Sequence, residues 1–432
     1  MNPLPYNPRM TPPRKLRIGS PATGDNFFPR NQLRDQILRA MGRDHVAFLG
    51  PRRTGKTSIL LDLEKNPPEG IEPIKLDLQG LRNVPAWLNL MLAETKKRIT
   101  PPETSRIDDV WQFGKRSFQF TKAKGDALLK RIDQISILGN GIKLQQGQPA
   151  VESWQPVADE FLELLKEHEL PIYFLLDEFP WFLGHVASNH TPAEVDATLN
   201  WFRKVRLELS ELSVRFLITG SIGLKGLLRR LNLSPAANDF DPIEIRPLSD
   251  SESVTFLREL AVGENISISD ECIQRMLDRI GVGWPILLAT FLSEVQEECL
   301  KSGHKMTVEN IDRLYEERMV RGSRNKYCEE MHTRLSKEAL FAPGERRLAH
   351  EILRQLCRSE RGIGTEELNS IHGKLVPDEA HRMLVAQDVD VVIETLTHDG
   401  YLIRRHDSNP ELDGRLEFAS HILRDFWRHR TA

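Results

Sequence analysis

Eight consecutive residues near the start of the chain have the composition of a phosphate-binding loop. They run from Gly50 to Thr57 and read Gly-Pro-Arg-Arg-Thr-Gly-Lys-Thr, which fits the pattern G-x-x-x-x-G-K-[ST]. Glycines in such a loop let backbone N–H groups converge on phosphate oxygens. The lysine, Lys56, reaches the β- and γ-phosphates, and the hydroxyl of Thr57 binds magnesium. The segment therefore predicts a site for a nucleoside triphosphate with Mg²⁺.

Two adjacent carboxylates supply a second piece of chemistry. Asp177 and Glu178 follow the apolar run at residues 172–176. At the carboxyl end of a buried strand, the first carboxylate can hold the magnesium shell, and the second can orient or deprotonate a water molecule. A buried strand followed by an acidic helix cap would give the same sequence. Beside a phosphate loop, the pair favours Asp177 as a metal-supporting residue and Glu178 as the base.

The elements that must position these residues alternate between strands and helices. Apolar segments predict five strands, at residues 46–49, 74–78, 172–176, 214–218 and 243–245. Nearly continuous apolar strands that alternate with helices indicate a parallel sheet covered on both faces. The phosphate loop falls between the first strand and a helical segment, which is the context that the motif requires.

The order of elements also predicts the domains. Residues 1–25, rich in proline and basic residues, are expected to form a flexible N-terminal arm. Residues 26–248 are predicted to form the core, with an insertion at about residues 100–150 that contains a hairpin and interleaved basic and aromatic side chains. Such interleaving can bind single strands, but lysines that extend over an aromatic core explain the same pattern and are the favoured explanation. A helical region at 249–340 precedes three helices and a hairpin at 341–432, the order of a winged helix.

Taken together, these residues resemble the P-loop ATPases that have an additional catalytic strand. More narrowly, the chain is similar to the AAA+ and STAND group, which includes prokaryotic ATPases related to archaeal and origin-recognition ATPases. The resemblance covers about residues 27–430 and is most specific in the phosphate loop and in Leu176–Pro180. It implies ATP as the nucleotide. The implied fold class is α/β, with a P-loop NTPase core and a parallel five-stranded sheet, followed by a helical lid and a C-terminal winged-helix domain.

Further site residues depend on this resemblance alone. Thr219 and Ser221 lie where the family has a polar residue that senses the γ-phosphate and positions the attacking water; a strand-end cap is the alternative. Gly283 and Pro285 match a G-x-P motif that touches the base, and a simple helix break is the alternative. The predicted nucleotide contacts are Gly50, Pro51, Arg52, Arg53, Thr54, Gly55, Lys56, Thr57, Ser58, Gly283 and Pro285. The predicted catalytic residues are Lys56, Glu178, Thr219 and Ser221, and the predicted metal contacts are Thr57 and Asp177.

The group often uses an arginine to stabilise charge on the transferred phosphoryl group. The candidates are Arg203, Arg206, Arg229 and Arg230. A solvated position on a helix face is the alternative for each of them.

Bulk composition limits the possible classes of protein. The 432 residues carry a net charge of −3, which gives no overall attraction to nucleic acid or membranes. No apolar run approaches the length that spans a bilayer, and the first residues lack the apolar segment of a secretory signal. The four cysteines are not in CxxC pairs, so we expect reduced thiols in a cytoplasmic protein.

Three functions remain open. The leading one is a magnesium-dependent ATP hydrolase, slow or partner-stimulated, that acts as a molecular switch toward a protein partner or a second copy of itself. The second is a DNA-binding or remodelling ATPase of the loader or initiator kind. Asp388, Asp390 and Glu394 in the expected recognition helix disfavour it, because DNA binding requires neutralised phosphates. The third is a module that binds nucleotide without hydrolysing it, which the acidic pair disfavours.

Overall fold

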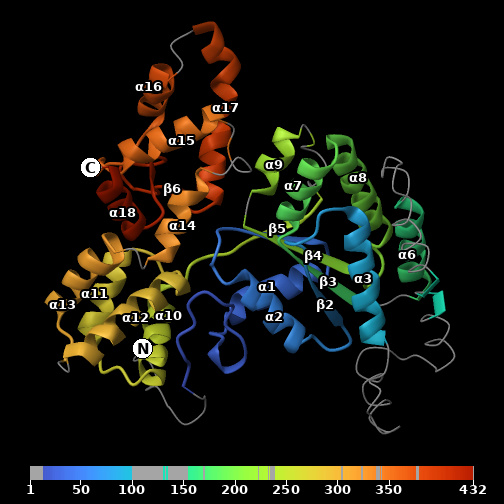
Figure 1. Ribbon diagram of the computed structural model, residues 1–432, viewed down its shortest axis with the longest axis horizontal. Coiled ribbons are helices and arrows are strands. Elements are labelled where there is room, and N and C mark those ends of the chain that lie inside the picture. Colours follow the sequence, from blue (N-terminus) through green and yellow to red (C-terminus); the bar gives the residue numbers. More distant parts are fainter. Residues whose placement is uncertain are drawn as a thin grey trace. The chain divides into compact units, whose positions relative to one another are not determined.

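The chain folds into two compact units in the computed structural model (Figure 1). The sheet unit comprises residues 30–49 and 59–244, and the lid unit comprises residues 1–29, 50–58 and 245–432. The structure describes residues 13–99, 130–131, 133–134, 154–168, 171–221, 223–231, 233, 239–302, 305–322, 325–336, 341, 343–375 and 379–431. The insertion expected at about residues 100–150, with its hairpin, lies almost entirely outside them.

A five-stranded parallel sheet forms the centre of the sheet unit. Its strands are β1 (Val46–Leu49), β2 (Glu72–Asp77), β3 (Ile172–Asp177), β4 (Arg215–Gly220) and β5 (Asp241–Glu244). The order β2-β3-β4-β1-β5 places β4 between β1 and β3. The register pairs Leu49 with Gly220 and Asp77 with Asp177, so the carboxyl ends lie along one edge. The predicted fold class, including an additional strand, is confirmed.

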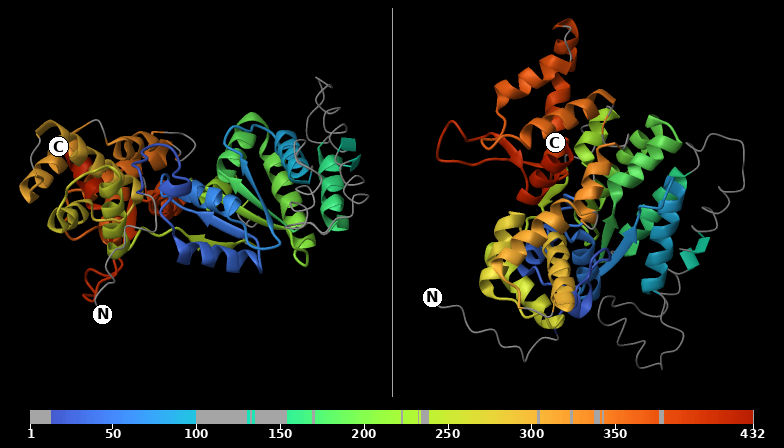
Figure 2. Two further views of the ribbon diagram at one scale, coloured as in Figure 1. Left: turned by 90° about the horizontal axis from the view of Figure 1, so that it is seen from below. Right: turned by 60° about the vertical axis from the view of Figure 1, so that its left-hand side comes forward.

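Helices cover both faces of this sheet (Figure 2). They are α1 (Asn31–Met41), α2 (Lys56–Lys65), α3 (Val84–Ile99), α6 (Gln155–His168), α7 (Phe179–Asn189), α8 (Pro192–Glu208) and α9 (Leu224–Arg230). Successive strand residues point to opposite faces. Phe174, Leu176, Phe216 and Ile218 therefore join one core with α3, α6, α7 and α8. The α1 and α2 helices lie on the opposite face.

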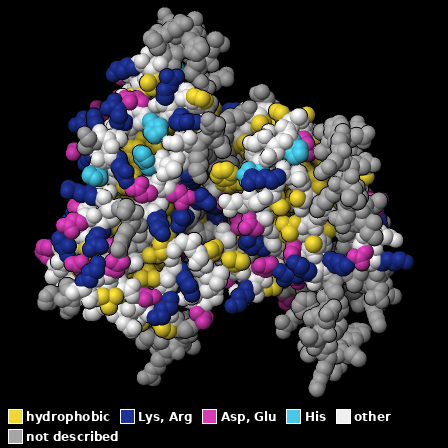
Figure 3. Space-filling view, viewed as in Figure 1, with side chains coloured by type: hydrophobic (Ala, Val, Ile, Leu, Met, Phe, Trp, Pro, Cys, Tyr) yellow, Lys and Arg dark blue, Asp and Glu magenta, His cyan; other side chains and the backbone are white. Residues whose placement is uncertain are grey.

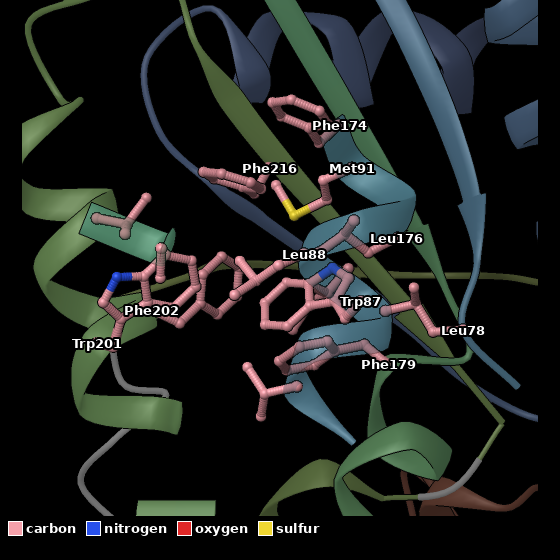
Figure 4. Packing of buried hydrophobic residues seen from close by; sticks show 14 of the residues in the cluster. Leu78, Trp87, Leu88, Met91, Phe174, Leu176, Phe179, Trp201, Phe202 and Phe216 are labelled. Carbon is pink, nitrogen blue, oxygen red and sulfur yellow. The ribbon is translucent and has the colours of Figure 1, made fainter. Parts of the chain in front are cut away.

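Aromatic side chains, among them Trp87, Phe179 and Phe202, cluster in the core of the sheet unit (Figure 4). Trp87 of α3 is fully buried and makes edge-to-face contacts with Phe179, Phe182 and Phe202, at centroid distances of 5.7, 5.3 and 5.3 Å. Each such pair contributes about 0.5–1.5 kcal/mol beyond the area that it buries. Phe179 directly follows the acidic pair in the sequence, so the core holds the turn at the end of β3.

The lid unit is mainly helical. Its elements are η1 (Gly24–Asn26), α10 (Asp250–Gly263), α11 (Asp270–Ile280), α12 (Pro285–Ser302), α13 (Val308–Leu314), the π-helix η4 (Tyr315–Val320), α14 (Lys326–Arg334), α15 (Pro343–Leu356), α16 (Thr365–Leu375), α17 (Glu379–His398), β6 (Leu402–Arg404), β7 (Leu416–Phe418) and α18 (His421–Thr431). The three helices α15–α17 and the antiparallel β6–β7 hairpin give the expected winged helix. The regions predicted as lid and winged helix lie together in this unit, and their boundaries stay predictions.

Part of the expected flexible arm is held in place. Arg14 is buried, and its Nη1 lies 3.0 Å from Glu259 Oε2 of α10. At Gly263 of the same helix, a Cβ atom would lie only 1.8 Å from the carbonyl oxygen of Arg14. An ion pair and a close backbone contact thus hold the chain at Arg14, and the flexible arm over residues 1–25 stays a prediction.

The cysteines Cys272, Cys299, Cys328 and Cys357 form no disulfide. Of the helices that the structure describes, none combines the length and the apolar character needed to cross a bilayer.

A buried imidazole lies at the start of β1. Nδ1 of His45 accepts a hydrogen bond from the backbone N–H of Phe216 at 3.1 Å. The proton is therefore on Nε2, which donates to the carbonyl oxygen of Arg206 at 3.0 Å. Burial lowers the pKa of His45 from 6.5 to about 4, so this side chain is neutral in the folded protein.

We expect His45 to make folding sensitive to acid. The folded pKa lies below the unfolded value, so the unfolded chain binds more protons between about pH 6.5 and pH 4, and stability falls as the pH drops through this window. One proton changes the free energy of unfolding by about 1.4 kcal/mol per pH unit. In urea unfolding across this range, His45→Gln should flatten the pH dependence by up to that amount. Equal slopes for both proteins would contradict the assignment, because the other histidines contribute to both.

Candidate functional site

The structure divides the predicted site residues between the two units. Asp177, Glu178, Thr219 and Ser221 lie in the sheet unit, and residues 50–58 belong to the lid unit together with Gly283 and Pro285. Each group is described below in its own unit.

Asp177 is anchored from both neighbouring strands. It ends β3, whose residues are all buried, and is itself 4% exposed. Its Oδ1 accepts a hydrogen bond of 2.6 Å from Thr219 Oγ1 of β4, and its Oδ2 lies 3.5 Å from Lys75 Nζ of β2. The predicted residue Thr219 thus contacts the predicted metal-supporting residue. The sequence analysis did not single out Lys75, because its place beside β3 depends on strand pairing.

Glu178 adopts a backbone conformation that is unusual for glutamate. Its φ of 58° and ψ of 37° lie in the left-handed region, immediately before α7. This conformation costs about 1–3 kcal/mol for a residue with a side chain, and such residues often occur at functional sites. Its Oε2 accepts hydrogen bonds from the N–H and the hydroxyl of Ser221, both 3.1 Å long. Ser221 Oγ in turn accepts a bond of 3.2 Å from Trp181 Nε1.

The end of β4 lies close to the turn after Glu178. A Cβ atom on Gly220 would lie 2.5 Å from Pro180 Cδ and 2.6 Å from Pro180 Cγ. Only glycine allows this approach, because real Cβ contacts are longer. The approach brings Ser221, the next residue, to the Glu178 carboxylate.

In the phosphate loop, backbone carbonyl groups contact the ammonium group of Lys56. Lys56 is 6% exposed, and its Nζ donates to the carbonyl oxygens of Gly50 and Pro51 at 2.8 and 2.6 Å. The hydroxyl of Thr54 also donates to the carbonyl of Pro51, at 2.8 Å. Gly55 has a φ of +100°, which residues with a side chain rarely adopt. Lys56 begins α2, and Thr57 and Ser58 lie in its first turn.

The loop also packs against elements far along the chain. Glu330 of α14 accepts from both loop arginines: Nη1 of Arg52 lies 2.5 Å from Oε1, and Nε of Arg53 lies 2.8 Å from Oε2. A Cβ atom on Gly400 would lie 2.7 Å from Pro51 Cγ. Sequence reasoning missed Glu330, and no local pattern marks it, since it is separated from Arg52 by 278 positions.

Gly283 and Pro285 lie at a close backbone crossing in the lid unit. The carbonyl of Gly283 accepts from the N–H of Leu248 at 2.9 Å, and a Cβ on Gly283 would lie 2.2 Å from the Leu248 carbonyl oxygen. Pro285 is the first residue of α12. The segment therefore breaks the helical region, and contact with a base stays a prediction.

One of the candidate arginines is structural. Arg206 of α8 is 1% exposed and pairs with Asp239 through two hydrogen bonds of 2.9 and 2.8 Å. Its guanidinium also lies 4.1 Å from the ring centroid of Phe240. These contacts and its burial hold in place a side chain that an arginine finger would need to extend. Arg203 and Arg229 are exposed, and Arg230 ends α9.

No family model matches the sequence, and no curated protein matches it. Among solved structures, a Walker-type ATPase of Pyrococcus abyssi is similar over 96% of this chain and 99% of its own, with a TM-score of 0.56 and 17% identity. The ORC2 protein of Aeropyrum pernix is similar over 94% of this chain and 97% of its own, with a TM-score of 0.46 and 12% identity. The chain thus shares its overall fold with the Walker-type ATPase of Pyrococcus abyssi.

The contact between Gly220 and Pro180 can be tested by adding one methyl group. We expect Gly220→Ala to lower the free energy of unfolding by about 1–3 kcal/mol, because the new Cβ overlaps the proline ring. The matched control is Gly184→Ala in α7, where nothing lies within 4 Å of the added Cβ. In a helix that change should stabilise by up to about 1 kcal/mol. Urea unfolding midpoints that fall in the opposite order would refute this account of the turn.

Proposed function

We propose that this protein binds ATP with Mg²⁺ and hydrolyses it. The observation that carries the proposal is the acidic pair at the end of β3, with Thr219 donating to Asp177 and Ser221 donating to Glu178. The pair lies on the sheet of a Walker-type fold. In the sequence, the phosphate loop directly follows Leu49, the last residue of β1.

The proposed roles follow from the chemistry of each side chain. Lys56 exchanges the loop carbonyls for oxygens of the β- and γ-phosphates. Glu178 orients a water molecule and takes its proton while the water attacks the γ-phosphorus, and the bond to the β–γ bridging oxygen breaks. The products are ADP and phosphate. Thr219 positions Asp177 and Ser221 positions Glu178, and either can also sense the γ-phosphate.

The residues present fit magnesium. Mg²⁺ prefers oxygen ligands and takes one or two from the protein, with the rest from phosphates and water. The hydroxyl of Thr57 and the carboxylate of Asp177 are of this kind. Within the part of the chain that the structure describes, no cluster of three or more His, Cys, Asp or Glu side chains forms a site for a metal alone. The choice of ATP, and contact of Gly283 and Pro285 with its base, follow from the family resemblance.

The contacts of the phosphate loop within the lid unit support the proposal that the protein acts as a nucleotide-dependent molecular switch. Arg52 and Arg53 contact Glu330, and Pro51 lies close to Gly400, so a change in the loop on nucleotide binding alters contacts of α14 and of the turn that follows α17. A ligand shifts a conformational equilibrium only through such differential contacts. Slow or partner-stimulated turnover suits this role, and we expect it to operate in the cytoplasm.

A protein partner or a second copy of the chain is favoured over DNA. Two arginines of the hairpin have acidic neighbours: Arg405 Nη2 lies 2.7 Å from Asp407, and Arg415 pairs with Glu367. On the face shown in Figure 3, basic and acidic side chains are interspersed over the lid unit. Neutralising phosphates requires a concentration of basic groups. If DNA stimulated phosphate release at low salt, that result would instead favour a DNA-binding ATPase of the loader or initiator kind.

The principal test separates binding from hydrolysis. We expect Glu178→Gln to lower kcat by at least about 100-fold, because the amide cannot take the proton from water. ATP affinity should stay near that of the wild type, since the substitution keeps the shape of the side chain. Phosphate release measures the first quantity, and titration with a fluorescent ATP analogue measures the second.

Lys56→Ala is the control, because it should lose both binding and turnover. Wild-type rates in Glu178→Gln would refute the assigned base. Tight ATP binding by a wild-type protein that releases no phosphate with any partner would instead support the non-hydrolysing module.

A further inference from the structure

The two arginines of the phosphate loop share one carboxylate. Both oxygens of Glu330 are engaged, one by Arg52 and one by Arg53. We call these ion pairs the Glu330 bridge. The Glu330 side chain is 22% exposed and the two arginines are about one third exposed, so the bridge is only partly screened by water. Burial acts to raise the pKa of Glu330, but Arg52 and Arg53 outweigh it, and the pKa is lowered.

The basic groups of the loop are therefore satisfied by protein oxygens. Lys56 donates to the carbonyls of Gly50 and Pro51, while Arg52 and Arg53 donate to Glu330. Arg53 has a φ of 61°, a left-handed conformation that costs energy unless other contacts hold it. A triphosphate presents the same kind of acceptor to guanidinium and ammonium groups as a carboxylate does.

Glu330 lies on a helix that is itself firmly held. Asn325 caps α14 by accepting from the N–H of Cys328 at 3.2 Å. One turn after Glu330, Arg334 pairs with Asp399 at 3.3 Å, and both side chains are essentially unexposed. The hydroxyl of Tyr401 donates to the carbonyl of Met331 at 2.6 Å.

These contacts join α14 to the end of α17 and to the start of β6. Gly400, which packs on Pro51, lies in the same stretch. We call α14 and residues 399–401 the platform. The loop contacts this platform at two points: the charged contact is with Glu330, and the apolar contact is with Gly400.

We propose that Glu330 competes with the triphosphate for Arg52 and Arg53, so that the Glu330 bridge holds the loop in its nucleotide-free form and nucleotide binding releases α14. This inference rests on the proposed function and assigns a regulatory element to the same site. Because coupling between two binding events is reciprocal, the bridge weakens nucleotide binding by the same factor as nucleotide weakens the bridge. The platform then carries the change to α17 and β6.

The test compares two neighbouring glutamates of α14 in the full chain. Glu330→Gln keeps the shape and removes the charge, and it should tighten binding of a fluorescent ATP analogue with Mg²⁺ by about 10-fold. Glu329→Gln is the matched control. Glu329 pairs with Arg430, which is outside the loop, so the affinity of this variant for the ATP analogue should stay at the wild-type value. Amide hydrogen exchange of residues 50–58 without nucleotide should be faster in Glu330→Gln than in Glu329→Gln.

A second comparison tests whether the effect of Glu330→Gln on affinity acts through Arg52 and Arg53. In a chain that carries Arg52→Gln and Arg53→Gln, Glu330→Gln should leave the affinity unchanged, because the bridge is already absent. Weaker or unchanged binding in the single Glu330→Gln variant, with a thermal midpoint near that of the wild type, would overturn the inference. Failure of the proposed nucleotide binding has a different signature, since the wild-type chain itself would then bind no ATP analogue.

Discussion

Burial of the Asp177 charge is the constraint on which the rest of the site depends. The whole of β3 is buried, and a carboxylate withdrawn from water in this way costs several kcal/mol unless donors replace its hydration. Thr219 donates a hydrogen bond to one oxygen, and the ammonium group of Lys75 forms an ion pair with the other. They can do so only if β2 and β4 lie on either side of β3. The order of the strands therefore determines which side chains contact Asp177.

The two neighbouring carboxylates have separate environments. Asp177 is enclosed between strands, whereas Glu178 leaves the strand in a left-handed turn and is only half-buried. The turn is stabilised by apolar packing around Phe179 and by the close approach of Gly220 to Pro180. Two adjacent carboxylates thus have different partners, as the different roles proposed for Asp177 and Glu178 require.

Features encoded locally could be predicted from the sequence, and features created by tertiary pairing could not. The bounds of β1 match the prediction, and the phosphate loop and acidic pair follow from short motifs. The start of β2 was misplaced, since Glu72 is a buried polar residue that pairs with Arg98. Lys75 and Glu330 acquire their partners only after distant segments pack. Arg206 looks like a surface residue in the sequence, yet Asp239 and two aromatic rings bury it.

The assignment of residues 50–58 to the lid unit also affects how the chain folds. The loop is synthesised early, but the residues that pack on it, Ile245, Glu330 and Gly400, follow much later. Contacts between such distant positions carry a large loop-closure entropy and form slowly. On the ribosome, strands β1 to β5 can pair before most of the lid unit exists. The loop acquires its native contacts only when nearly the whole chain has emerged, so incomplete chains would lack a properly formed phosphate loop.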